Sequence, residues 1–127
     1  MVVHCIDFRF QQAMNGYFDK EFLGEYDLIS VAGGAKGIVE REDYLFNQMA
    51  ISCRLHSPEN IVLIQHEDCG AYGGTSELGE REEDFQREQL SKAEENIKQA
   101  RLQLIAAVKQ VLENGLNLLE IEAPAEM

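Results

Sequence analysis

The sequence predicts an α/β fold: one domain over residues 1–127, with a mainly parallel β-sheet of about four strands flanked by helices. Short apolar runs alternate with segments whose apolar residues recur every three or four positions, the pattern of strands followed by helices. The 127 residues, 45% of them hydrophobic, suffice for a single core. Strands separated by helices pair in parallel through right-handed crossovers, and the helices cover both faces of the sheet.

Each element of the first half follows from its local pattern. The first strand is expected over residues 1–7, and the apolar spacing then becomes helical until Gly24, which is placed to end the helix. A second strand is expected over residues 27–32 and a second helix over residues 39–56. Cys53 lies among the apolar residues of that helix, so we interpret it as a buried structural thiol.

The second half contains the central strand and a long charged segment. The third strand is expected over the apolar run that begins at Ile61. Of the charged segment, residues 77–114, the second half has the periodicity of an amphipathic helix that Gly115 closes. Its first part, residues 80–88, is expected to face solvent. Residues 116–122 alternate in hydrophobicity and predict a fourth strand.

The chain is strongly acidic, with 23 Asp and Glu against 11 Lys and Arg and a net charge of −12. This charge repels phosphate backbones and anionic lipids, so neither nucleic acid nor a membrane surface is expected as a partner. No apolar run approaches the roughly 20 residues that span a bilayer, and no signal-peptide pattern is present. We therefore expect a cytoplasmic protein. The 3 cysteines do not resemble a disulfide framework, which leaves them as ligands or nucleophiles.

Two of the predicted strands end in residues that bind metals. Cys5 follows the first apolar run, and His66 and Cys69 follow the run from Ile61. Ligand sites form at the carboxyl ends of parallel strands where strand order reverses, so the three side chains should converge if the strands are neighbours. Two thiolates and one imidazole suit zinc and leave a fourth place for water, whose pKa then falls to about 7. We predict one catalytic zinc ion per chain, held by these three residues.

Asp7 and Arg9 are the candidate catalytic residues beside this metal. Alternation along an extended strand places residues 5, 7 and 9 on one side. A bidentate Arg9–Asp7 pair would keep the carboxylate deprotonated and oriented toward the zinc-bound water. If Arg9 withdrew, Asp7 could become a fourth ligand and close the site. His4 points to the opposite side and is interpreted as a core or interface histidine.

Three glycines within five residues follow the second predicted strand: Gly33, Gly34 and Gly37. This spacing lets the backbone turn tightly or approach a ligand closely. The stretch fails the phosphate-loop pattern, which needs Gly-x-x-x-x-Gly-Lys followed by Ser or Thr. We expect a tight turn beside the site, with Gly33, Gly34 and Gly70 bordering the substrate pocket.

The stretch Cys5-Ile-Asp-Phe-Arg9, followed by His66-Glu-Asp-Cys-Gly-Ala71, resembles the β-class carbonic anhydrases. The segment Ser30-Val-Ala-Gly-Gly34 is similar to the glycine segment after that family's second strand. The resemblance implies Rossmann-like layering, zinc on Cys5, His66 and Cys69, and an Asp7–Arg9 dyad. It implies reversible hydration of carbon dioxide to bicarbonate and a proton through a zinc-bound hydroxide. It also implies a homodimer or higher homo-oligomer whose sites lie near the subunit interface.

Two other functions remain open. The same zinc site could hydrolyse another small substrate, such as carbonyl sulfide or carbon disulfide, because a metal hydroxide attacks any compact electrophilic carbon. Alternatively, the chain could be a zinc-binding domain without turnover, with the charged segment over residues 77–95 serving as an interaction arm. A phosphatase loop is disfavoured because Arg9 follows Cys5 too closely, and a dithiol redox site is disfavoured because Cys-x-x-Cys is absent.

Overall fold

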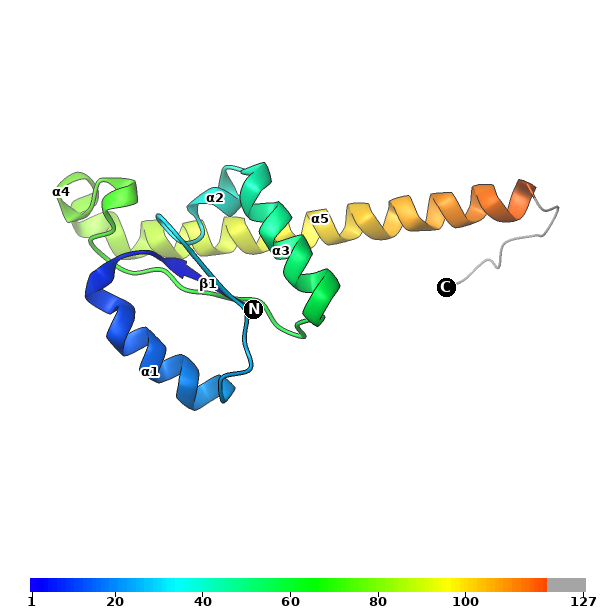
Figure 1. Ribbon diagram of the computed structural model, residues 1–127. Helices are drawn as coiled ribbons and strands as arrows, with labels where there is room; N and C mark the ends of the chain where they lie inside the picture. Colours follow the sequence, from blue (N-terminus) through cyan, green and yellow to red (C-terminus); the bar gives the residue numbers. More distant parts are fainter. Residues whose placement is uncertain (119–127) are drawn as a thin grey trace. The chain divides into compact units, whose positions relative to one another are not determined.

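The computed structural model describes the backbone of residues 1–118 and the side chains of residues 1–112 and 114. The chain divides into two compact units, Met1–Glu94 and Glu95–Met127. Helix α5 (Glu82–Leu118) begins in the first unit and continues into the second (Figure 1). The interpretation of the whole chain as one domain stays a prediction.

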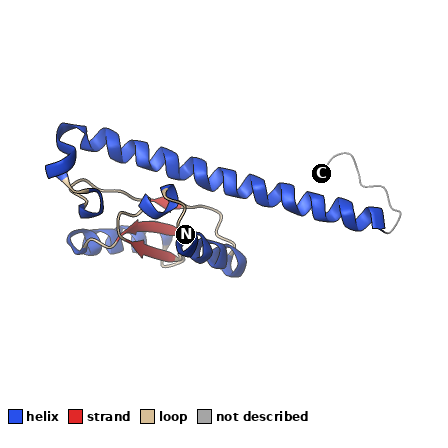
Figure 2. Cartoon of the chain, turned by 90° about the horizontal axis from the view of Figure 1, so that it is seen from above, coloured by secondary structure: helices blue, strands red, loops and turns tan. Residues whose placement is uncertain are grey.

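The first unit contains a three-stranded parallel sheet flanked by helices, shown in red and blue in Figure 2. Its strands are β1 (Val2–Cys5), β2 (Leu28–Val31) and β3 (Val62–Leu63), in the order β2-β1-β3. Both neighbours pair with β1 in parallel. The predicted α/β class and parallel sheet are therefore confirmed, although the described residues form three strands rather than about four.

The predicted fourth strand over residues 116–122 is not found in the described residues. Its first three residues belong to helix α5, which passes through Gly115 and ends at Leu118. The remaining residues, 119–122, lie outside the described part of the chain. The prediction that Gly115 closes the helix is wrong, because a single glycine costs a helix only about 1 kcal/mol and does not stop it.

Central strand β1 is buried along its whole length, as expected for a strand between two neighbours. Helix α1 (Gln11–Phe22) packs on it through Phe18, which is fully buried with its ring 5.7 Å from the ring of His4. His4 is a core residue, as predicted. The helix ends where the sequence indicated, with Leu23 and Gly24 both in the left-handed region.

The predicted helix over residues 39–56 corresponds to α3 (Asp43–His56), which begins four residues later, and a separate short helix, α2 (Lys36–Val39), ends where the prediction begins. The chain breaks between them at Arg41, whose φ of 57° is left-handed and incompatible with a continuous helix. Cys53 in α3 is exposed, so its interpretation as a buried residue is wrong. The short elements η2 (Gly70–Tyr72), α4 (Thr75–Leu78) and η3 (Gly79–Arg81) connect β3 to α5.

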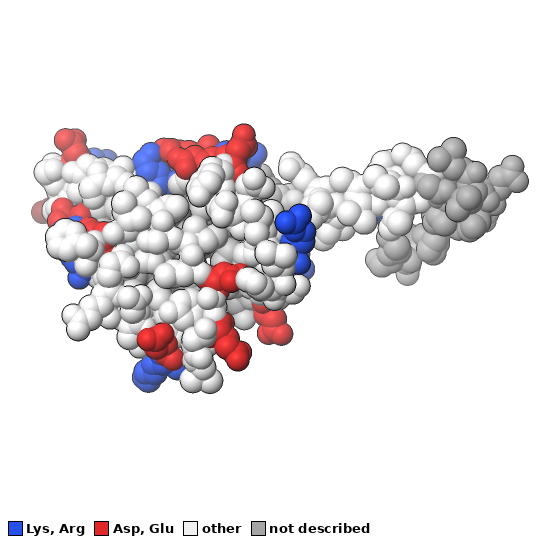
Figure 3. Space-filling model, in the orientation of Figure 1, with Lys and Arg blue, Asp and Glu red and all other residues white. Residues whose placement is uncertain are grey.

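Helix α5 differs from the prediction in its first turns. Glu82, Gln86, Gln89 and Ala93 are buried, so this part of the charged segment does not simply face solvent. In the second unit, the apolar side chains from Leu102 to Leu112 are exposed, and the face drawn in Figure 3 shows few charges there. No helix among the described residues combines the length and apolar character needed to cross a membrane.

Candidate metal centre

The structure brings Cys5, His66 and Cys69 together at one edge of the sheet. Cys5 is the last residue of β1, and the other two lie in the loop that follows β3, its parallel neighbour. The chain runs from β1 to β2 on one side and returns to β3 on the other, so strand order reverses at β1, where ligand sites form. One donor atom from each side chain lies within 4.8 Å of the other two.

The donor atoms of this cluster fit zinc. The Sγ atoms of Cys5 and Cys69 are 3.8 Å apart, and a tetrahedral zinc with Zn–S bonds of about 2.3 Å requires a sulfur separation of about 3.8 Å. His66 Nδ1 lies 2.6 Å from the carbonyl oxygen of Glu67 and donates a hydrogen bond to it. That tautomer leaves Nε2 with a free lone pair. Nε2 is buried and has no hydrogen-bond partner among the described residues, as expected for a ligand atom.

The two thiols have opposite pKa shifts. Burial raises the pKa of Cys5, but the neighbouring His66 ring and the hydrogen bond from the Gly33 amide outweigh burial, so the pKa lies below its ordinary value. The pKa of Cys69 is raised by burial, and the charge on Cys5 adds to the effect. Cys5 is therefore the thiol that ionises first, and a cation between the two sulfurs is needed to hold both as thiolates.

Asp7 and Arg9 form the predicted pair, but on a different backbone. Strand β1 ends at Cys5, and Asp7 instead caps the 3-10 turn η1 (Phe8–Phe10), accepting a hydrogen bond from the Arg9 amide. The predicted strand alternation is therefore wrong here. The Arg9 guanidinium binds both carboxylate oxygens of Asp7, at 3.0 Å and 3.1 Å from Nε and 2.6 Å from Nη2. These bonds lower the pKa of Asp7 to about 2, and its Oδ2 lies 3.9 Å from His66 Nε2.

Asp68 is a further residue of this site that the sequence reasoning did not assign. Its carboxylate accepts a hydrogen bond from Arg9 Nη1 at 2.7 Å, and its carbonyl oxygen accepts one from Nη2 at 2.8 Å. Asp68 lies between His66 and Cys69 in the same loop, so its closeness to any bound metal could have been inferred from sequence. Its pairing with a residue near the start of the chain could not.

The glycine segment makes a tight turn beside the thiols. The Gly33 amide donates to Cys5 Sγ at 3.4 Å. A Cβ at Gly34 would stand 2.6 Å from Gln65 Oε1, so only glycine fits there without a shift of its neighbour. Gly70, in contrast, has open space at its Cα. The role of these glycines as the border of a substrate pocket stays a prediction.

A cavity of about 530 Å³ opens beside the cluster. Cys5 and His66 lie on its wall with Gln65, and its other described lining residues are apolar or aromatic: Phe10, Ala13, Met14, Tyr17, Val62 and Ile64. The ring of Phe10 lies 4.6 Å from the ring of His66. A small apolar molecule can therefore approach the cluster without passing charged groups.

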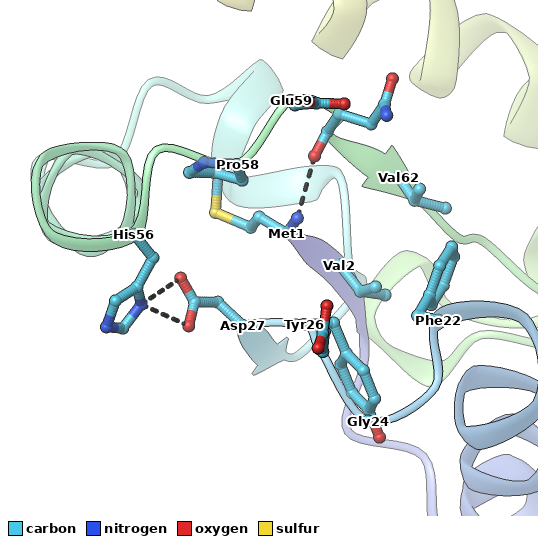
Figure 4. Close-up of a pocket in the computed structure, with 12 residues that line it drawn as sticks. Met1, Val2, Phe22, Gly24, Tyr26, Asp27, His56, Pro58, Glu59 and Val62 are labelled. Carbon is cyan, nitrogen blue, oxygen red and sulfur yellow. Dashed lines mark hydrogen bonds and ion pairs between the residues drawn. The ribbon is translucent and has the colours of Figure 1, made fainter.

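A larger cavity, of about 760 Å³, lies at the other end of the sheet, where the strands begin. Figure 4 shows Met1, Val2 and Val62 on its wall and the pair formed by Asp27 and His56, whose Nδ1 lies 2.8 Å from Oδ1. A hydrogen bond from Ser52 is the main cause that lowers the pKa of Asp27, and the pair with His56 lowers it further. None of the clustered ligands borders this cavity, so it is not the metal site.

Comparison with known proteins assigns the chain to a family. A family model described as "Putative carbonic anhydrase" matches residues 1–114. The chain belongs to this carbonic anhydrase family. All three ligand candidates and the Asp7–Arg9 pair fall within the match. The family description does not specify the β-class.

A further similarity is local. Over 36 residues, this carbonic anhydrase family member is 61% identical to an arginine–tRNA ligase of Thermococcus kodakarensis. The matching segment covers 28% of the chain and 6% of the ligase. The chain thus spans a small fraction of that relative, and the similarity carries no function across. No solved structure matches the chain.

Proposed function

We propose that the chain is a β-class carbonic anhydrase that reversibly hydrates carbon dioxide to bicarbonate and a proton, with one zinc ion per chain. The observation that carries this proposal is the cluster of two thiols and one buried imidazole nitrogen, without a hydrogen-bond partner in the described part of the chain, at the ends of adjacent parallel strands. The family match supports the same reaction.

Cys5, His66 and Cys69 would hold the zinc ion, and three protein ligands are the number usual in catalytic rather than structural zinc sites. Bound zinc supplies Lewis-acid chemistry, lowering the pKa of a coordinated water to about 7. The hydrogen bond to the Glu67 carbonyl fixes the His66 ring and leaves Nε2 as the nitrogen that can bind a metal. The Gly33 amide donates to Cys5 Sγ and disperses part of the thiolate charge.

Asp7 would act as a fixed acceptor beside the metal. The pKa of about 2 keeps its carboxylate ionised over the whole physiological range, so it accepts a hydrogen bond and cannot donate one. Its Oδ2, 3.9 Å from His66 Nε2, is close enough to orient the proton of a water in the site. If Arg9 released it, the same carboxylate could reach the metal as a fourth ligand and close the site.

The cavity beside Cys5 and His66 would receive the substrate. Because carbon dioxide has no net dipole, it can enter this mainly apolar cavity without hydrogen bonds from the wall. A cavity of this size also admits carbonyl sulfide or carbon disulfide, so its size does not discriminate among the three substrates.

Stopped-flow hydration of carbon dioxide on protein of known zinc content, between about pH 6.5 and about pH 9, tests the proposal. We expect one zinc per chain and turnover that is lost in Asp7→Ala with zinc retained. Asp19→Ala, an exposed aspartate on α1, is the matched control and should behave as wild type. Zinc without any turnover would favour the non-enzymatic binding domain. Turnover of only carbonyl sulfide or carbon disulfide would favour the related hydrolase.

The chain would work as a homodimer or higher homo-oligomer with the site near the subunit interface. In support, Ile6 and Phe8 lie beside the dyad, and Phe8 is 85% exposed, an unusual position for a large apolar ring next to a site. Light scattering coupled to gel filtration should give at least a dimer, and Phe8→Glu should shift it toward the monomer. Leu23→Glu, at a residue that is 84% exposed, is the matched control.

A further inference from the structure

The dyad beside the candidate metal centre is connected to a buried carboxyl group on helix α5. Glu82, the first residue of α5, is only 6% exposed. One of its carboxyl oxygens accepts a hydrogen bond from the Asp68 amide, and the other accepts one from Thr75 Oγ1 at 2.7 Å. Both donors belong to the segment that follows His66, so Glu82 anchors the loop that carries two of the metal ligands.

The backbone of Asp68 turns so that its two sides meet different partners. Its φ is 52°, in the left-handed region, which is uncommon for non-glycine residues although aspartate tolerates it better than most. In this conformation the Asp68 amide points to Glu82, while its carbonyl oxygen and carboxylate both face Arg9. Its other carboxylate oxygen accepts from the Thr75 amide at 3.2 Å. The two sides of one residue thus connect α5 to the dyad.

Arg9 is consequently held from two directions. Asp7 binds it through Nε and Nη2, and Asp68 binds it through Nη1 and Nη2. The Arg9 side chain is 42% exposed and that of Asp68 is 55% exposed, against 15% for Asp7, and an exposed ion pair does little to fix a long side chain. The hydrogen bond from Arg9 Nη2 to the Asp68 carbonyl oxygen differs, because the backbone amide of the same residue is held by the buried Glu82. This backbone contact adds a second anchor for Arg9 to the pair with Asp7.

We propose that Glu82 and Asp68 are positioning residues that keep Arg9 on Asp7 and thereby hold the Asp7 carboxylate beside the metal position rather than on the metal. The proposal rests on the proposed function only for its catalytic consequence. The connection from Glu82 to Arg9 exists in the chain with or without turnover, and it can be measured separately.

The direct readout is the exchange with water of the Arg9 Nε–H proton, observed by NMR in the zinc-loaded full chain and identified by its loss in Arg9→Lys. A hydrogen-bonded guanidinium exchanges slowly. In Glu82→Ala the Asp68 amide loses its acceptor, so we expect Arg9 exchange to accelerate by about tenfold. Glu82→Gln keeps an acceptor oxygen for this amide and should restore exchange close to that of wild type.

The matched control is Glu83→Ala, which changes the same first turn of α5 at an exposed residue that pairs with Arg87. It should leave Arg9 exchange unchanged. Asp68→Asn is the second variant: asparagine tolerates the left-handed backbone, but the neutral amide weakens the bond to Arg9 Nη1, so exchange should accelerate. If Glu82→Ala does not fold, Asp68→Asn decides alone. Unchanged Arg9 exchange in every folded member of this pair overturns the proposal.

Zinc content and carbon dioxide hydration, measured on the same samples, separate this proposal from the proposed function. We expect Glu82→Ala to keep one zinc per chain and to lose turnover in parallel with the faster Arg9 exchange. If the wild type binds zinc without turnover and Arg9 exchange is faster in Glu82→Ala, the positioning role stands and the carbonic anhydrase proposal fails. If Arg9 exchange is unchanged in the variants and the wild type hydrates carbon dioxide, the positioning role fails and the carbonic anhydrase proposal stands.

Discussion

The two thiols should together release between one and two protons per chain when zinc binds at neutral pH. Both sulfurs, 3.8 Å apart, must be thiolates to bind the metal. Cys69, whose pKa is raised by burial, enters as a neutral thiol and gives up a full proton. Cys5 gives up less of its proton than Cys69 does, because the neighbouring His66 ring and the hydrogen bond from Gly33 outweigh burial and lower its pKa. The two thiols therefore release more than one proton and fewer than two, and a zinc-bound water with a pKa of about 7 adds part of another.

The number of released protons fixes how zinc affinity depends on pH. Each proton released raises the association constant about tenfold per pH unit. The thiols alone should thus make the apparent affinity rise between about tenfold and about a hundredfold per unit as pH increases through neutrality. Their contribution to the slope should approach one proton as Cys5 becomes fully ionised, since only the Cys69 thiol then still carries its proton. In Cys69→Ser the contribution of that thiol disappears, and the affinity itself falls.

Calorimetric titration of metal-free protein with zinc, in two buffers of different ionisation enthalpy, counts these protons directly. Competition with a chelator at several pH values gives the affinity slope independently. A slope of zero, or zinc affinity that is unchanged in Cys69→Ser, would refute the assignment of Cys5 and Cys69 as joint ligands. An exposed-thiol control, Cys53→Ser, should leave both measurements unchanged.

Further predictions concern the dyad, the core and the turn. Asp7→Ala should keep one zinc per chain and reduce carbon dioxide turnover by about a hundredfold or more, measured by stopped flow. Phe18→Ala removes a fully buried ring and should lower the free energy of unfolding by about 3–5 kcal/mol in urea denaturation. Gly34→Ala puts a Cβ where φ is 52° and Gln65 Oε1 is 2.6 Å away, so thermal melts should show destabilisation of about 1–3 kcal/mol. Burial raises the pKa of Tyr72 to about 12, so its phenolate absorbance should be absent at neutral pH and appear only in strong alkali.

The parts of the site that the sequence predicted depend on strand ends. An apolar run that stops at Cys5 and another that leads to His66 specify where two strands finish, and parallel pairing brings those ends to the same edge. The spacing within the second loop then determines that Cys69 follows. No knowledge of exact strand length was needed: β3 is only Val62–Leu63, much shorter than the apolar run, and the convergence is unaffected.

The Asp7–Arg9 pair was predicted for a reason that the structure does not support. Strand alternation was expected to place the two side chains together, but the strand ends at Cys5. The pair forms because Asp7 caps a 3-10 turn and Arg9 lies on its first turn. Residues two apart meet on the same side of a strand and also across such a turn, so the contact could be predicted although its backbone could not.

Helix boundaries were less predictable because their causes are weak or distant. The break between α2 and α3 depends on the left-handed backbone at Arg41, a residue type that gives no such signal, unlike glycine. Conversely, Gly115 gives a strong signal, and α5 continues past it. In each case the local conformational preference of the residue is worth only about 1 kcal/mol, so other interactions along the chain can outweigh it.

The buried carboxyl of Glu82 is the clearest limit on sequence reasoning. It stands in a run of charged residues with Glu83 and Asp84 beside it, and composition alone gives all three the same solvent-facing expectation. What distinguishes Glu82 is a pair of donors, the Asp68 amide and the Thr75 hydroxyl, that are available only after the loop following His66 has folded. A buried polar group is tolerated where its partners are in place. Its position at the end of the connection to Arg9 therefore depends on the fold of the loop, and the loop in turn depends on it.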